Sequence, residues 1–485
     1  MSQHTTLLIF IFLYLILNIF IGYWASKRVH DSNDFIQAGR SLPMFFNATA
    51  LFALWFGSET VFGASSEFMK HGLSGVIEDP FGGVLALLLF GFFFVRKLYR
   101  LNILTLSDLL RDKYGKTVEL MSAIFMVFSF FGYIAAQLLA LGIILKNVVP
   151  GMELYSAILI CSVLVTFYTF IGGMWAVTIT DLIHNIVIVI GLIALAIFFT
   201  NEAGGLGAVM EKYHANPGRT FEFFPEDGAL NWTNWWSAWL VLGLGSLCSQ
   251  DIFQRANSAK NERAAVNSTY WGAILYLIMA ALPLYIGFVV KYHYYGGVVN
   301  EEVDMQQTFP QLVLSEAPLV LQILFFGSVL SAVLSVASGA LLAPASIISE
   351  NIVRPLSKNK LSDKKFLWIL RLSVVFMAII STITAFMGED IYELVAMSSI
   401  VGMVSLLGPV TAALYWKKSS KVGAMLSMIL GFTSWAVFEY IVKPEYYSFL
   451  PALFLSILAL VAGSYLFKDK TEPVTGELID IKIKT

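Results

Sequence analysis

Long apolar stretches separated by short polar ones run along almost the whole chain. About thirteen of these stretches approach the roughly 20 apolar residues that an α-helix needs to cross a bilayer. They centre near residues 16, 56, 88, 134, 164, 190, 244, 280, 332, 377, 404, 432 and 458. Because unpaired backbone groups are costly in lipid, and no alternation typical of a membrane β-barrel is present, the pattern predicts an all-α membrane protein.

Lysine and arginine residues give the expected orientation. With the N-terminus outside, 25 of the 31 basic residues fall on the cytoplasmic side, as the positive-inside rule requires. The first apolar run has no lysine or arginine before it, and Lys27 and Arg28 follow it, which favours a transmembrane helix over a cleaved signal peptide. We therefore expect a multi-pass protein of the plasma (inner) membrane, with its C-terminus in the cytoplasm.

The second apolar segment is interrupted by the polar sequence WFGSETVFG. Gly57 and Gly63 bracket Ser58, Glu59 and Thr60. A charged side chain at the bilayer centre costs at least about 2.5–3.5 kcal/mol, so this face must meet protein or water. Glycines can form a tight helix contact, or they can let a helix break and expose carbonyl groups to a ligand. The carboxylate between them favours a binding site.

The seventh segment, VLGLGSLCSQDIFQR, has the same character. It places Gly245, Ser249, Gln250 and Asp251 inside an apolar span. Two glycine-interrupted helices five positions apart indicate an inverted repeat with a binding site near the membrane midplane. Asp251 has an alternative place at the cytoplasmic helix end, solvated beside Arg255.

These interruptions predict two inverted five-helix repeats with broken second and seventh helices. The repeats are expected at 43–200 and 232–416. The remaining parts are a first peripheral helix with a cytoplasmic loop at 1–42, an extracellular loop at 201–231, peripheral helices at 417–467 and a cytoplasmic tail at 468–485.

Composition narrows the class further. The chain is 58% hydrophobic and 13% charged, whereas soluble domains carry about 25% charged residues. The net charge of -2 gives no basic excess for nucleic acid. Cys161 and Cys248 both lie in apolar segments, so no disulfide is expected. No metal-ligand histidine pair or nucleophile motif is present, and we do not expect an enzyme.

The ninth segment carries a row of serines in GSVLSAVLSVASGALLAPAS. Ser328, Ser331, Ser335 and Ser338 recur at three- and four-residue spacing and share one helix face. Such a face can be a small-residue packing surface with hydroxyls bonded back to carbonyls, which composition alone favours. It can also offer hydroxyl oxygens to a monovalent cation.

Several motifs together resemble the sodium/solute symporter family, in particular its proline- and choline-type members. They are AGRSLP before the second helix, FIGGMWAVTITDLIH at 170–184, QDIFQR at 250–255, and LSAVLSVASGALLAPASIISENI in the ninth helix. The resemblance implies a LeuT-type fold and a cation-coupled symporter, with Na⁺ as the expected cation, for a small organic solute by alternating access.

The resemblance also implies a sodium site. Its ligands would be the carbonyls of Ala53, Phe56 and Ala332 and the hydroxyl of Ser335, while the family's second hydroxyl falls on Val336, which has no side-chain oxygen. Ser338 or water would have to replace it. Asp181 matches a family acid beside the ion's exit path, so Ser338 and Asp181 are candidates for a second site or that path.

The predicted substrate site comprises Trp55, Gly57, Glu59, Ser249 and Gln250. Trp55 stands where the choline branch has a tryptophan that can form a cation–π wall, but Ser249 replaces that branch's second tryptophan. We expect Glu59 to face the cavity near Gln250. These features favour an amine or zwitterion and argue against choline itself.

Two alternatives stay open. Transport could be coupled to protons through Glu59 or Asp181, or the chain could be a symporter-like membrane sensor module. The expected partners are a small-molecule substrate and membrane lipid, with no nucleic acid, no organic cofactor and function as a monomer.

Overall fold

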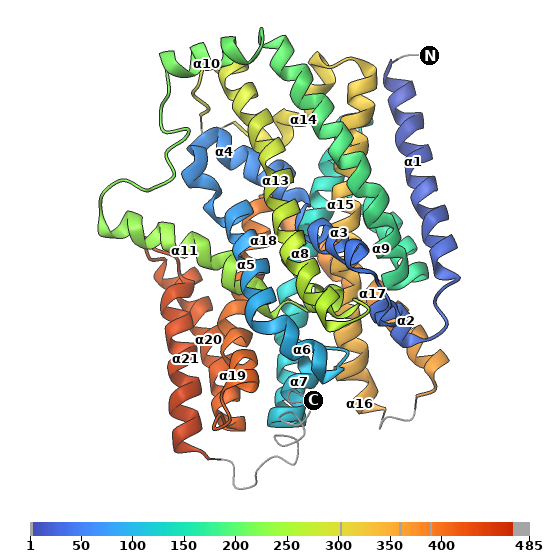
Figure 1. Ribbon diagram of the computed structural model, residues 1–485, viewed down its shortest axis with the longest axis vertical. Helices are drawn as coiled ribbons and strands as arrows, with labels where there is room; N and C mark the ends of the chain where they lie inside the picture. The colour runs from blue at the N-terminus through green and yellow to red at the C-terminus, as the bar shows by residue number, and fades with distance from the viewer. Residues whose placement is uncertain (1–2, 301–302, 358–360, 389, 469–485) are drawn as a thin grey trace.

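The computed structural model is helical throughout and describes residues 3–300, 303–357, 361–388 and 390–468 (Figure 1). No β-strand is present in these ranges. Among the described residues, ten helical stretches are long and apolar enough to cross a membrane. The prediction of an all-α membrane protein is therefore confirmed. The tail expected at 468–485 lies outside the described residues except for its first residue.

The count of thirteen crossings is not confirmed and stays a prediction. Two of the ten stretches, Glu59–Leu101 with 43 residues and Leu154–Glu202 with 49, are longer than the roughly 20 residues of one crossing. Each contains non-helical backbone, at Asp79 in the first and Gly173 in the second. Counting by length alone therefore merges neighbouring crossings.

The helices follow one another along the chain with short connections. Their bounds are α1 Gln3–Ser26, α2 Ser32–Gln37, α3 Met44–Trp55, α4 Ser65–His71, α5 Gly83–Leu89, α6 Val95–Leu101, α7 Leu106–Tyr114, α8 Lys116–Val148, α9 Leu154–Glu202, α10 Leu206–Ala215, α11 Ala229–Gly245, α12 Gln250–Asn257, α13 Glu262–Tyr294, α14 Met305–Glu316, α15 Leu319–Ile347, α16 Arg354–Leu356, α17 Asp363–Met387, α18 Ile391–Gly402, α19 Gly408–Tyr415, α20 Lys421–Val437 and α21 Phe449–Leu466.

Helix α15 is the central element of the bundle. It packs against α8, α9 and α17, and it also touches α3 and α12 (Figure 1). Every residue from Phe325 to Ser346 is buried, and this segment is rich in glycine, alanine and serine. Small side chains let neighbouring backbones approach closely, which explains how one helix serves so many partners.

The outer helices present apolar side chains outward. Exposed large hydrophobic residues recur along α1, α17, α20 and α21, including Phe12, Phe376, Leu430 and Phe454. Helices α20 and α21 pack mainly on each other and on the π-helical turn η8, Met403–Leu407, which follows α18 (Figure 1). This apolar belt is the surface that a bilayer covers.

The second membrane segment is broken where the sequence predicts it. Helix α3 ends at Trp55, and Phe56 leaves the helical region with ψ 72°. The Gly57 N–H donates to the Trp55 carbonyl at 3.1 Å instead of reaching back four residues to Ala53. Helical structure resumes at Glu59 as the π-helical turn η2, Glu59–Ala64.

The seventh segment is broken in the same way. Helix α11 ends at Gly245, the 3₁₀ turn η6 covers Ser246–Cys248, and Ser249 is extended before α12 begins. A Cβ atom on Gly245 would lie 2.7 Å from the Ser399 carbonyl oxygen on α18. Only glycine allows this approach of two backbones at the break. Both predicted interruptions are confirmed.

Candidate functional site

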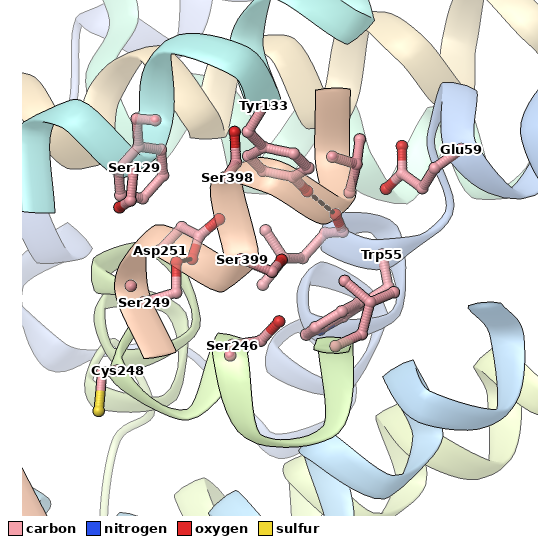
Figure 2. Close-up of a pocket in the computed structure, with 16 residues that line it drawn as sticks. Trp55, Glu59, Ser129, Tyr133, Ser246, Cys248, Ser249, Asp251, Ser398 and Ser399 are labelled. Atoms are coloured by element: carbon pink, nitrogen blue, oxygen red, sulfur yellow. Dashed lines mark hydrogen bonds between the residues drawn. The ribbon is translucent and has the colours of Figure 1, made fainter. Parts of the chain in front are cut away.

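The two helix breaks open onto one buried cavity (Figure 2). Its volume is about 40 Å³. Four parts of the fold line it: the second segment, α8, the seventh segment and α18. The lining residues are Leu54, Trp55 and Glu59; Ser129, Phe130 and Tyr133; Leu242, Gly245, Ser246, Cys248, Ser249 and Asp251; and Val395, Ser398, Ser399 and Gly402. A cavity must offer roughly 10–15 Å³ to hold a water molecule, so this one can hold water. An organic solute requires the lining to move apart.

Glu59 lines this cavity and is only 2% exposed. Gln137 on α8 donates from Nε2 to Glu59 Oε2 at 2.8 Å, and its Oε1 accepts the Ser58 N–H at 3.1 Å. One amide therefore holds the carboxyl group and satisfies a backbone donor freed by the helix break. The sequence analysis missed Gln137, although a lone amide in the apolar run YIAAQLLALG was a usable signal.

Trp55 forms another wall of the cavity. Its residue exposure is 7%, its indole Nε1 has no hydrogen-bond partner among the described residues, and its ring centroid lies 6.3 Å from that of Tyr276. A buried indole N–H normally finds an acceptor. The cavity thus combines an aromatic ring, an unused donor and the Glu59 carboxyl group.

Asp251 and Ser249 lie where the seventh segment resumes its helix (Figure 2). The Ser249 hydroxyl donates to Asp251 Oδ1, which also accepts the Ile252 N–H at 2.8 Å. Asp251 is 4% exposed and lines the cavity. The alternative position, solvated at the cytoplasmic helix end beside Arg255, is therefore wrong.

The Gln250 side chain binds the backbone at the start of α7 and does not line the cavity. Its side chain accepts the Leu106 N–H at 2.9 Å and donates to the Leu104 carbonyl at 3.0 Å, which ties α12 to the start of α7. It is not among the residues that line the cavity. The structure therefore brings Trp55, Glu59 and Ser249 together and places Gln250 outside the group.

The predicted sodium ligands lie where α3 faces α15. Ala53, Phe56, Ala332 and Ser335 are all at most 1% exposed. A Cβ on Gly57 would come within 2.9 Å of Val336 Cγ2, so the break of the second segment touches α15 at Val336. The Val336 side chain therefore places a methyl group at this contact, where the family has a hydroxyl oxygen.

Two serines of α15 are already engaged. The Ser335 hydroxyl donates to Asp181 Oδ1 on α9, and the Ser338 hydroxyl donates back to the Ser335 carbonyl at 2.9 Å. Asp181 Oδ2 lies 3.7 Å from Arg255 Nη2 on α12, and both side chains are at most 2% exposed. The result is a buried chain of Ser335, Asp181 and Arg255 that joins three helices.

The ten apolar stretches of the described residues, the two helix breaks and the buried cavity between them agree with the LeuT-type fold that the motifs imply. A sequence model described as the Sodium:solute symporter family matches residues 35–431. The chain belongs to this family.

Curated relatives include transporters for two different solutes. The chain is 28% identical over 439 residues to "High-affinity choline transporter 1" of Drosophila melanogaster, covering 86% of this chain and 68% of that protein. It is 24% identical over 475 residues to the "High-affinity proline transporter PutP" of Bacillus subtilis, covering 95% and 98%.

A solved structure agrees in fold. A Na⁺-coupled sialic acid symporter in a substrate-bound outward-open state superposes with a TM-score of 0.82 at 17% identity, covering 97% of this chain and 99% of the other. At this identity the match supports the fold and leaves the solute undecided.

Proposed function

We propose that this protein is a sodium-coupled symporter that carries a small amine or zwitterion across the plasma (inner) membrane by alternating access. The observation that carries the proposal is the meeting of two broken helices at a buried cavity that holds Glu59, Trp55 and Asp251. Broken helices of inverted repeats typically bind substrate and coupling ion near the midplane.

The chemistry of the cavity favours a positively charged group on the solute. Glu59 and Asp251 supply two carboxyl groups, and Trp55 supplies an aromatic face suited to a cation. Choline and proline, the solutes named for the relatives, both carry a charged nitrogen. A neutral sugar or a dicarboxylate would leave these groups without a cationic partner.

The sodium ion is assigned to the contact between α3 and α15. The carbonyls of Ala53, Phe56 and Ala332 and the Ser335 hydroxyl are its proposed ligands, and Ser338 with Asp181 would form a second site or the exit path. Because Val336 offers no oxygen, the affinity for sodium is expected to be low within the family. The Ser335 hydroxyl would have to turn from Asp181 to the ion.

Purified protein in liposomes tests the proposal. An inward sodium gradient should drive uptake of radiolabelled proline, choline or another amine from a mixed panel, while an equal potassium gradient should not. Uptake that ignores sodium and follows an imposed proton gradient would contradict the proposed ion and favour coupling through Glu59 or Asp181. No uptake of any amine or zwitterion would contradict the solute class.

A further inference from the structure

A further buried carboxyl group, Asp79, lies close to the cavity residue Trp55. It is 0% exposed and sits at the non-helical position of η4, Ile77–Gly82, with φ -138° and ψ 126°. Within the described residues it takes part in no ion pair with lysine, arginine or histidine. A carboxylate ion buried without a cation is costly, whereas a neutral carboxylic acid with hydrogen bonds is tolerated.

The oxygens around Asp79 outnumber the hydrogens available to join them. Thr60 Oγ1 lies 3.0 Å from the Trp55 carbonyl oxygen, 2.9 Å from Asp79 Oδ2 and 2.8 Å from the Tyr276 hydroxyl. The Tyr276 hydroxyl also contacts Asp79 Oδ1. Each hydroxyl brings one hydrogen, so two hydrogens serve four contacts. A proton on Asp79 supplies a third hydrogen. The Tyr276 hydroxyl hydrogen can then be shared between Thr60 Oγ1 and Asp79 Oδ1.

We propose that Asp79, with Thr60 and Tyr276, forms a proton-binding site, and that its proton is a second coupled cation of the transporter. The ligand is a proton because the oxygens lie 2.8–2.9 Å apart, at hydrogen-bond distance and closer together than oxygens that share a sodium ion. The inference that Asp79 holds a proton depends on this geometry alone. Its part in coupling rests on the proposed function.

The site is joined directly to the cavity through Trp55. Thr60 bonds to the Trp55 carbonyl, and a Cβ on Gly83 would lie 3.2 Å from the Trp55 ring, 3.1 Å from the Tyr276 ring and 3.4 Å from Asp79 Oδ1. The Trp55 ring therefore packs between the cavity and the carboxyl group. A solute that moves Trp55 disturbs the hydrogen bonds that hold the proton.

Other titratable groups face Asp79 from the elements packed around it. They are Glu59 on η2, Glu78 on η4, Tyr276 on α13 and Tyr392 on α18, whose hydroxyl accepts the Asp79 N–H at 3.0 Å. All four are acids or weak acids close to a carboxyl group, with no base among them. This surrounding adds to the electrostatic reason for Asp79 to hold a proton.

A route for the proton leads through Glu78. Glu78 is 6% exposed, and burial followed by the nearby charges of Glu78 and Glu67 raises the pKa of Tyr447. Tyr447 lines a surface hollow of about 530 Å³ together with Lys291 and Arg219. Glu78 adjoins Asp79 in the chain and lies close enough to Tyr447 to interact with it electrostatically, which makes Glu78 the proposed carrier of the proton between this hollow and Asp79.

Infrared spectroscopy of the full-length protein in liposomes tests the site without any substrate. The expected result is a protonated-carboxyl band that disappears at alkaline pH and shifts when aspartate is ¹³C-labelled at its side-chain carboxyl. Asp79→Asn should remove one component of the band, whereas Asp251→Asn should keep it. Tyr276→Phe should move its frequency, which covers the case that Asp79→Asn fails to fold. The proposal would be overturned if the wild-type protein shows no aspartate band, or if the band is unchanged in both Asp79→Asn and Tyr276→Phe.

A pH-sensitive dye inside the same liposomes tests the coupling. During sodium-driven uptake of proline or choline the interior should acidify, and Asp79→Asn should abolish at least about nine-tenths of that signal, a tenfold loss of proton flux per solute. Solute uptake without acidification in the wild type would overturn proton coupling. If neither solute enters, the proposed function fails while the infrared result still decides the proton site.

Discussion

Gln137 shows how much of the site depends on single contacts. Its amide holds Glu59 on one side and the backbone of the helix break on the other. Glu59 therefore has a neutral partner and no cationic one among the described side chains, so a cationic solute would supply the charged partner that this buried carboxyl group lacks. The carboxyl group and the break are one unit, because the same amide serves both.

Glu59→Gln is the first residue-scale test. The variant keeps the shape and hydrogen bonding of the side chain and removes its charge. Since a hydrogen bond to a charged group contributes about 1.5–3 kcal/mol, we expect kcat/KM for a cationic solute to fall at least about tenfold. Uptake kinetics at several pH values measure it. Unchanged solute affinity, ion dependence and pH profile would make Glu59 a structural residue.

Val336 and Ser335 offer a matched pair for the ion site. Ser335→Ala removes a proposed ligand and should raise the sodium concentration for half-maximal uptake several-fold. Val336→Ser adds the oxygen that the site lacks and should lower that concentration, since cation affinity follows the number of ligand oxygens. Sodium titration of uptake measures both. If the sodium concentration for half-maximal uptake does not change in these variants, or shifts in the opposite directions, the sodium ion does not bind at this contact.

At the scale of elements, the breaks depend on backbones that approach too closely for a side chain. Gly57 and Gly245 would each bring a new Cβ to within 2.7 Å of another atom, and at Gly245 that atom is a backbone oxygen of α18. The glycines and polar residues in the sequence predict where the helices break. They cannot predict which way side chains point afterwards, because the break rotates the chain. This is why Asp251 faces the cavity and Gln250 does not.

Gly245→Ala should separate α11 from α18 and disturb the cavity. Overpacking typically costs about 1–3 kcal/mol, so we expect a lower thermal unfolding midpoint and uptake reduced at least tenfold. Gly207→Ala on α10 is the control, because its Cβ would meet nothing within 4 Å. Thermal unfolding and uptake of the two variants should differ clearly. Equal behaviour would show that the close approach is not needed for transport.

At the scale of the whole molecule, the sequence predicts the helical membrane fold and its repeats well because lipid allows few alternatives. The number of crossings is harder to settle, since Glu59–Leu101 and Leu154–Glu202 run on through their bends. The proposed proton site also escaped prediction. Asp79 and Tyr276 are almost 200 residues apart in sequence, and only the packed bundle brings them to Thr60.

Ion coupling sets how far the molecule can concentrate its solute. One charge moving through about 100 mV supplies about 2.3 kcal/mol, which corresponds to roughly fifty-fold accumulation. Movement of sodium alone with a zwitterion should therefore give a steady-state ratio near this value at equal sodium concentrations, whereas a second coupled cation, the proton on Asp79, should raise the ratio to roughly its square. Radiotracer accumulation at a clamped potential measures it. A ratio that does not change with membrane potential would exclude net charge movement.

The small cavity has a consequence for affinity. A solute can bind only to molecules whose lining has already opened or opens with it, so the measured dissociation constant is the intrinsic one divided by the open fraction. If one molecule in a hundred is open, binding is about a hundredfold weaker than the contacts alone allow. Substitutions far from Glu59 that favour the open form would then tighten binding without touching the solute, and compounds selected against the closed form would miss the site.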